Sequence, residues 1–349
     1  MTVIFSDLHL REASEEVCFR VLAAIEALAI EHGSHVVFCG DWWHLRYQVN
    51  VRILNRVADL MRRWEYNGIS IDLLVGNHDQ VDVKGGNALE VLEYDGDPES
   101  STQLRVWTEP GYDQARGWGF VPYRKDPDEQ LRALAEVAAK GVTTIFGHFA
   151  IKGALMNNGT KDRDGLELPG GSYRLVLGHY HMAQTGPQGR YVGSPYQTSF
   201  GEAGNVCGCL LLDDKLGNLK FHQLDVGAPL HHIVEWDPAT QPEPPENPGR
   251  PGDFVRLDIK ASQEMLVSGK FKGVLKQHGL DEAQINVIPT KVDRQHKFEL
   301  GRGETLLDAA ERFVGERLGA TDQVVNAGLA DRVDPANTVM GALRRWADG

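Results

Sequence analysis

The clearest sign of the fold lies in residues 175–202, LVLGHYHMAQTGPQGRYVGSPYQTSFGE. The apolar run at residues 173–177 predicts a buried strand, and the glycine after it marks where the strand ends. His179 and His181 come directly after this glycine, two positions apart. In nearly extended chain, residues i and i+2 project to the same side, so both imidazoles can face one point, such as a metal ion. A single His-x-His is equally compatible with two histidines that face water, so the rest of the chain must decide.

The same arrangement, an apolar run followed by polar side chains, occurs at four earlier places. SDLH follows TVIF, GDWWH follows HVVFC, GNHD follows IDLLV, and GHF follows VTTIF. The polar residues of these clusters are Asp7, His9, Asp41, His44, Asn77, His78, Asp79 and His148. Because the carboxyl ends of strands in an α/β sheet lie along one edge, side chains distant in sequence can converge there. One cluster alone could be a capped turn, but five together predict a single site.

Asp, Asn and His side chains supply oxygen and imidazole nitrogen without thiolate. This donor set favours Mn²⁺, also suits Mg²⁺ or Fe²⁺, and does not exclude Zn²⁺. Seven such ligands suffice for two octahedral ions if one carboxylate bridges them and water completes the coordination. Two ions about 3.5–4 Å apart can clamp a phosphoryl group and activate water for in-line attack. The sequence therefore predicts two divalent metal ions and hydrolysis of a phosphate ester.

Composition limits the class of protein and the kind of partner. The hydrophobic content of 42% and the charged content of 24% are ordinary for a soluble folded protein. No apolar run approaches the roughly 18 residues of a membrane span, and the start MTVIFSDLHL lacks a basic segment, so we expect an intracellular protein. The net charge of −13 argues against coating nucleic acid by the overall field, although bound divalent ions would reverse the sign locally.

The order of predicted elements indicates several parts. Strands alternate with helices, expected at 15–32, 51–66 and 128–140, which predicts an α/β core; after residue 190, consecutive strands suggest an antiparallel region. Six of the sixteen prolines fall between residues 238 and 251 and indicate an extended linker. The predicted parts are a catalytic domain at 1–236, a Pro-rich linker at 237–252, a small α/β cap at 253–300 and a helical C-terminal region at 301–349.

The motif order D-x-H, G-D-x-x-H, G-N-H-D, G-H, G-H-x-H resembles that of the calcineurin-like metallophosphoesterases over residues 1 to about 225. His44 and the segment YVGSPYQTSFGE narrow the resemblance to the Mre11/SbcD nuclease branch, which includes phage recombination-nuclease subunits, because many family phosphatases carry Asp at that position. The resemblance implies an α/β two-sheet sandwich flanked by helices. Beyond it, a small C-terminal α/β cap and a helical tail are expected from architecture alone.

Carried over position by position, the resemblance implies a role for each cluster. One metal ion is expected on Asp7, His9, Asp41 and His181, and the other on Asn77, His148 and His179 with Asp41 as the bridge.

Two further histidines are expected to act on the substrate. His78 matches the family's catalytic histidine, which would stabilise or protonate the leaving oxygen. His44 would contact the phosphate or position DNA; a supporting hydrogen bond outside the metal's coordination is the alternative. Asp79 would hold the His78 ring or cap the loop. Trp42 and Trp43 could stack on bases, but adjacent aromatics beside a buried strand indicate packing.

The implied function is a two-metal-dependent DNA phosphodiesterase, acting as exo- or endonuclease. It would be the nuclease subunit of a complex with an SMC-like (Rad50/SbcC-like) ATPase in DNA repair, recombination or replication. Expected partners are DNA, this ATPase and a second copy of the chain, without a membrane; the expected location is the cytoplasm, or the host cytoplasm if the chain is phage-encoded. One alternative is a phosphatase or cyclic-nucleotide phosphodiesterase of the same fold, in which His44 would be unexpected. A non-catalytic scaffold is the other, although every ligand position is intact.

The last residues predict two helices with apolar stripes. Residues 334–349 can form a helix capped by Asp334, and residues 305–319 present a similar apolar face. The two helices could cover each other, or the last one could dock on the ATPase as C-terminal helices of the family do.

Overall fold

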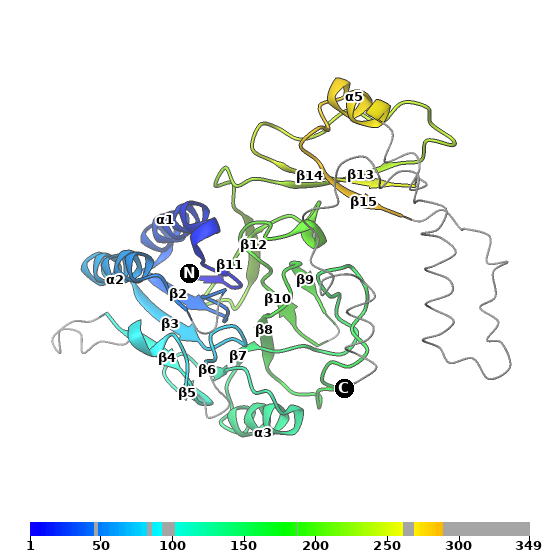
Figure 1. Ribbon diagram of the computed structural model, residues 1–349. Coiled ribbons are helices and arrows are strands. Elements are labelled where there is room, and N and C mark those ends of the chain that lie inside the picture. Colours follow the sequence, from blue (N-terminus) through cyan, green and yellow to red (C-terminus); the bar gives the residue numbers. More distant parts are fainter. Residues whose placement is uncertain (45–47, 82–85, 93–101, 187, 261–268, 289–349) are drawn as a thin grey trace, which may run out of the picture. The chain divides into compact units, whose positions relative to one another are not determined.

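Two six-stranded sheets form the centre of the computed structural model (Figure 1). The structure describes residues 1–44, 48–81, 86–92, 102–186, 188–260 and 269–288. The strands are β1 (Thr2–Phe5), β2 (His35–Phe38), β3 (Ser70–Leu74), β4 (Leu104–Trp107), β5 (Gly111–Asp113), β6 (Trp118–Val121), β7 (Thr144–His148), β8 (Arg174–Gly178), β9 (Gln184–Thr185), β10 (Arg190–Tyr191), β11 (Gly208–Leu212), β12 (Leu219–Gln223), β13 (His231–Trp236), β14 (Phe254–Ile259) and β15 (Gln284–Val287). The helices are α1 (Glu15–His32), α2 (Val51–Tyr66), α3 (Pro127–Ala138) and α5 (Gly269–Gln277), with short 3₁₀ helices η1 (Glu12–Ser14), η2 (Glu90–Leu92) and η3 (Phe200–Glu202).

The strand order places the parallel strands side by side in each sheet. The first sheet runs β12-β11-β1-β2-β3-β4, and β1 to β4 are parallel. The second runs β5-β6-β7-β8-β10-β9, and β6, β7, β8 and β10 are parallel. The carboxyl ends of β1, β2 and β3 therefore line one edge of the first sheet, and those of β7 and β8 line one edge of the second.

Alternation along the strands produces three apolar layers. In β1, Val3 and Phe5 pack under α1 and α2, whereas Ile4 points to the layer between the sheets. This middle layer also contains Val176 of β8. α3 packs its Leu134 against the second sheet from outside, so helices cover both outer faces of the pair of sheets (Figure 1). The predicted fold class, an α/β two-sheet sandwich flanked by helices, is confirmed.

Local signals set the ends of the helices. Asn50 caps α2, since its side chain accepts a hydrogen bond from the Arg52 amide at 2.8 Å. Asp126 caps α3 in the same way, so this helix starts one residue before the expected start at 128. Gly33 ends α1 with a φ of 137°, a conformation that side chains disfavour. No helix among the described residues combines the length and the apolar character needed to cross a membrane.

A third sheet, β13-β14-β15, consists of parallel strands covered by α5. The expectation of an antiparallel region after residue 190 is right for β11 and β12 and wrong for β13, which pairs in parallel with β14. β10 is mixed, because it pairs antiparallel with β9 and in parallel with β8. The Pro-rich residues 237–252 lie between β13 and β14 and thus connect two strands of one sheet. The expected helical region at 301–349 lies outside the described residues.

Candidate metal centre

The structure brings all nine predicted site residues to the neighbouring carboxyl ends of five strands. They are Asp7 and His9 after β1, Asp41 and His44 after β2, Asn77 and His78 after β3, His148 at the end of β7, and His179 and His181 after β8. Three loops of the first sheet thus meet two of the second, as the five polar clusters predict.

One group of donor atoms combines β1 and β8. Ligand atoms of Asp7, His9 and His181 lie within 4.8 Å of one another. The Nε2 atoms of His9 and His181 are 3.1 Å apart, and Asp7 Oδ1 is 3.9 Å from His181 Nε2. Asp41 Oδ2 lies 3.7 Å from His9 Nε2. These four residues are the set expected around one metal ion.

A second group combines β3, β7 and β8. Asn77 Oδ1 lies 3.0 Å from both His148 Nε2 and His179 Nδ1. Asp41 Oδ2, the atom near His9, is also 3.4 Å from His148 Nε2. One carboxylate oxygen therefore lies beside both groups, which is the position that a bridging ligand would need.

The chemistry of these donors fits cations. Asp7 and Asp41 are 0% and 2% exposed, and within the described part of the chain only histidines pair with them. Burial lowers the pKa of His9, and it lowers the pKa of His179 to about 3, so both imidazoles are neutral at pH 7. Two buried carboxylates surrounded by imidazole nitrogens offer the oxygen and nitrogen donors that a divalent cation binds.

The other two histidines are held by hydrogen bonds at Nδ1. His148 Nδ1 lies 2.7 Å from the Cys39 carbonyl, and His181 Nδ1 lies 2.8 Å from Glu202 Oε1. Donation from Nδ1 leaves Nε2 of each ring as the atom that faces the donor groups. Burial opposes protonation of both rings, but Asp41 raises the pKa of His148 to about 9 and Glu202 raises that of His181. A metal ion would displace these protons, so metal binding should weaken as pH falls.

Backbone conformation concentrates strain at the same residues. Asp7, His9, Asp41 and His179 have φ values of 55°, 47°, 64° and 99°. Only one further non-glycine residue of the described chain, Ser34, has a positive φ. Non-glycine residues adopt such conformations rarely and at a cost, and they cluster at functional sites. The strain therefore marks the predicted ligands independently of their side chains.

The glycines before the ligands are required by close packing of the loops. A Cβ atom on Gly76 would lie 2.2 Å from Asp41 Oδ1. On Gly178 it would lie 2.0 Å from Ser6 Oγ and 2.3 Å from the Cys39 carbonyl oxygen. Both distances are far below van der Waals contact, so only glycine fits. This explains the G-N-H-D and G-H-x-H patterns in physical terms.

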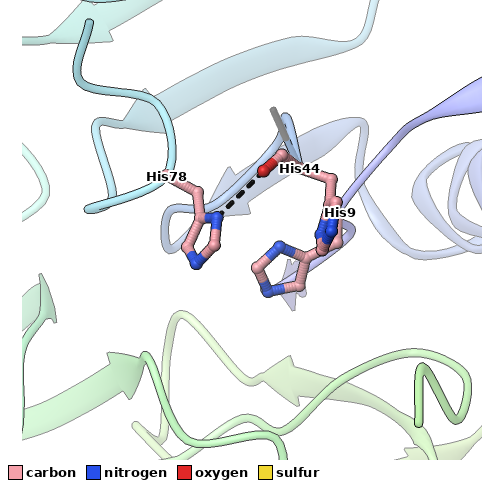
Figure 2. A group of neighbouring side chains, drawn as sticks. All are labelled: His9, His44 and His78. Atoms are coloured by element: carbon pink, nitrogen blue, oxygen red, sulfur yellow. Dashed lines mark hydrogen bonds between the residues drawn. The ribbon is translucent and has the colours of Figure 1, made fainter. Parts of the chain in front are cut away.

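His78 and His44 lie beside the first donor group. Figure 2 shows their rings together with His9, and ligand atoms of the three lie within 4.8 Å of one another. His78 Nδ1 is 3.0 Å from the carbonyl oxygen of His44. His44 Nε2 is 3.0 Å from Nη1 of Arg11, and burial together with this guanidinium lowers the pKa of His44. The two residues are thus placed to act on a molecule held at the donor groups.

Asp79 caps the loop instead of holding the His78 ring. Its carboxylate accepts hydrogen bonds from the backbone amides of Asp41, Trp43 and Gly76, at 2.8, 3.0 and 2.9 Å. The bonds from Asp41 and Trp43 tie the loop after β2 to the loop after β3, and the bond from Gly76 lies within the loop after β3. Trp42 and Trp43 are buried beneath them, 0% and 2% exposed, so the interpretation as packing is confirmed.

Two supporting residues were missed by sequence reasoning. Glu202 is 1% exposed, and besides His181 it accepts a hydrogen bond from the Thr198 amide at 2.9 Å. Asn157 Oδ1 accepts from the His181 amide at 2.8 Å. Glu202 ends the quoted segment YVGSPYQTSFGE, so a signal was present: a carboxylate soon after a predicted metal-binding histidine. For Asn157 no such signal exists.

The fold and donor groups define an α/β protein with a buried Asp/Asn/His site suited to divalent cations. No family model and no curated protein matches the sequence. Among solved structures, the chain is similar to the crystal structure of Pseudomonas putida nuclease MPE, with 16% identity and a TM-score of 0.28. The match covers 52% of this chain and 62% of that chain, less than two thirds of its length. At this level it assigns neither activity nor family.

Proposed function

We propose that this chain is a metallophosphoesterase that cleaves DNA with two divalent metal ions, in the manner expected for the Mre11/SbcD-like branch. The observation that supports this most directly is the position of Asp41. Its Oδ2 lies 3.7 Å from His9 Nε2 in one donor group and 3.4 Å from His148 Nε2 in the other. Two donor groups that share a carboxylate are the arrangement expected for a pair of ions acting on one phosphate.

The proposed ligands follow the donor groups. Asp7, His9, Asp41 and His181 would bind one ion, and Asn77, His148, His179 and Asp41 the other. Oxygen and imidazole donors without thiolate favour Mn²⁺. When bound, the ions would neutralise phosphate charge and activate the attacking water.

The remaining residues would handle the substrate. Because His78 Nδ1 can donate to the carbonyl of His44, the His78 Nε2 is left to face the leaving oxygen, which it would stabilise or protonate. His44, neutral and beside Arg11, would donate a hydrogen bond to a phosphate oxygen and align the strand. Asp79 would keep these loops in register through its three backbone hydrogen bonds.

The test compares substrate classes. Linear DNA should be digested in Mn²⁺ and spared in chelator, while a chromogenic phosphomonoester should react far more slowly. Asp41→Asn should abolish cleavage, because it weakens both donor groups, whereas Asp281→Asn, at an exposed position in the turn between α5 and β15, should behave as wild type. Full nuclease activity in chelator would exclude the two-metal proposal, and a preference for the monoester would indicate a phosphatase.

We further propose that the chain works as the nuclease subunit of an SMC-like ATPase complex. The support is the sequence resemblance and the net charge of −13, which is unsuited to tight DNA binding by the isolated chain. Deleting residues 334–349 should abolish co-purification with the ATPase and leave Mn²⁺-dependent cleavage intact. A truncated chain that binds this partner with undiminished affinity would refute the docking role.

A further inference from the structure

A cavity of about 320 Å³ lies next to the loop that carries His44. Trp43 and Arg11 form part of its wall, and these residues are, respectively, the neighbour of His44 in sequence and its hydrogen-bond partner in space. The volume lies at the lower end of the range for small-molecule sites, roughly 300–1,000 Å³. It offers room for one nucleoside but not for a stretch of duplex.

The wall of the cavity is mixed in a way that suits a nucleobase. Leu10, Trp43, Val49 and Ile53 supply apolar surface. Gln48 adds an exposed amide at the rim, and within the described residues this amide makes no hydrogen bond. Ligand sites typically combine apolar walls with a few polar groups, and a base presents two apolar faces and a hydrogen-bonding edge.

Arg11, a cation with spare hydrogen-bond donors, lines the cavity. Arg11 makes one hydrogen bond to a side chain, to the His44 imidazole, and no carboxylate of the described residues lies within ion-pair distance of it. Arg52 and Arg56 nearby differ, since both pair with Glu15. A guanidinium has five N–H donors and binds phosphate oxygens in pairs.

Glu12 also lines the cavity. Its carboxylate accepts a hydrogen bond from the Asn50 side chain and thereby ties η1 to the start of α2. Because the Glu12 carboxylate is negative and accepts from Asn50, the phosphate contact is assigned to Arg11, which is hydrogen-bonded to His44.

We propose that this cavity binds the nucleoside adjacent to the scissile phosphate of a DNA strand, and that Arg11 contacts the phosphate group that joins this nucleoside to the reaction site. The inference rests on the proposed function and adds a substrate class to it. The substrate would be a nucleoside phosphodiester within single-stranded DNA. The cavity would then select nucleoside esters over simple phosphodiesters, whereas Arg11 would contact the phosphate that both contain.

The test uses chromogenic diesters with and without a nucleoside. Thymidine 5′-(p-nitrophenyl phosphate) and its 3′ isomer are compared with bis(p-nitrophenyl) phosphate in Mn²⁺. Loss of an arginine contact to an anion changes binding by about tenfold or more. The wild-type protein should have a lower KM for one thymidine ester than for bis(p-nitrophenyl) phosphate, and the preferred isomer identifies the side of the phosphate. Arg11→Ala should raise KM for all three diesters by about tenfold, because each contains the phosphate that Arg11 contacts.

A second variant tests the cavity itself. Val49→Phe places a ring in the space and should raise KM for the preferred thymidine ester without raising KM for bis(p-nitrophenyl) phosphate. Arg52→Ala is the matched control, because Arg52 is an exposed arginine of the same region that pairs with Glu15 and does not line the cavity. It should leave the ratio of the two KM values unchanged.

The outcomes separate the two proposals. Hydrolysis of the diesters with an unchanged KM on all of them in Arg11→Ala, or a wild-type KM ratio in Val49→Phe, would overturn the nucleoside site and leave the proposed function standing. Failure of the wild-type protein to hydrolyse any diester in Mn²⁺ would overturn both.

Discussion

Replacing Glu202 by Gln tests the metal centre without touching a predicted ligand. Glu202 Oε1 accepts from His181 Nδ1 at 2.8 Å, and Oε2 accepts from the Thr198 amide at 2.9 Å and from Ser194 Oγ at 3.1 Å. Gln has nearly the same shape but only one acceptor oxygen, so its NH₂ group must face a donor. Either His181 or the Thr198 amide then loses its acceptor.

The magnitude follows from this lost acceptor. A buried donor without a partner costs about 1–3 kcal/mol, which corresponds to roughly 5- to 150-fold in a binding constant. Loss of a partner that orients a metal-bound histidine typically weakens metal binding by about 10- to 100-fold. We therefore expect a loss of about 10- to 100-fold for one of the two ions. The other ion should be spared, because Glu202 contacts neither His148 nor His179 in the described structure.

The assay is competition for Mn²⁺ with a fluorescent chelator, with the number of bound ions measured by elemental analysis. Ser199→Ala is the control, because its hydroxyl makes only a long contact, 3.4 Å, with the same carboxylate. Melting temperatures in chelator check that both variants fold. Two ions bound to Glu202→Gln with wild-type affinity would show that the carboxylate does not orient His181 toward a metal.

Three further predictions concern other residues. His78→Ala should lose most turnover but still bind two ions, because it is assigned to the leaving group; loss of an ion by elemental analysis would show that it is a ligand. His44→Ala should impair DNA cleavage more than hydrolysis of a small phosphodiester, and equal losses on both would remove its role in aligning DNA. Asp72 is 0% exposed; burial opposes its ionisation, but His35 and Arg105 hold its pKa below the usual value. Its stabilising effect should therefore be complete above about pH 4 and fade below it. Asp72→Asn should lower the free energy of unfolding by about 3 kcal/mol at pH 7 and by less at pH 3, and a difference independent of pH in denaturant titrations would contradict this.

The fold and the convergence of the candidate ligands could be predicted because each depends on local pattern. Apolar runs end at a glycine followed by Asp, Asn or His, and parallel strands carry those ends to one edge. Gly76 and Gly178 strengthen the pattern, since the site leaves no room for a Cβ at either position.

Other features depend on contacts that no local pattern encodes. The sequence allowed Asp79 either to hold the His78 ring or to cap the loop. The second role depends on hydrogen bonds from three backbone amides, which only the folded chain brings to its carboxylate. β13 pairs with β14 across a Pro-rich connection. The prolines exclude helix and central strand in that connection, but they do not indicate which strands pair on either side of it. Arg11 belongs to no sequence motif. Its role is inferred from its hydrogen bond to His44 and from the absence of an ion-paired carboxylate beside it among the described residues.

The division of the donor groups between two sheets has a consequence for synthesis of the chain. Asp7, Asp41 and Asn77 leave the ribosome early, but His179 and His181 follow Asn77 by about a hundred residues. At translation rates of roughly 5–20 residues per second, this delay lasts about 5–20 s. Throughout that time, and in any prematurely released fragment that ends before His179, neither group of donors is complete. On the proposed function, an unfinished polypeptide of this kind would not cut DNA, and the capacity to do so would arise only once the second sheet has been made.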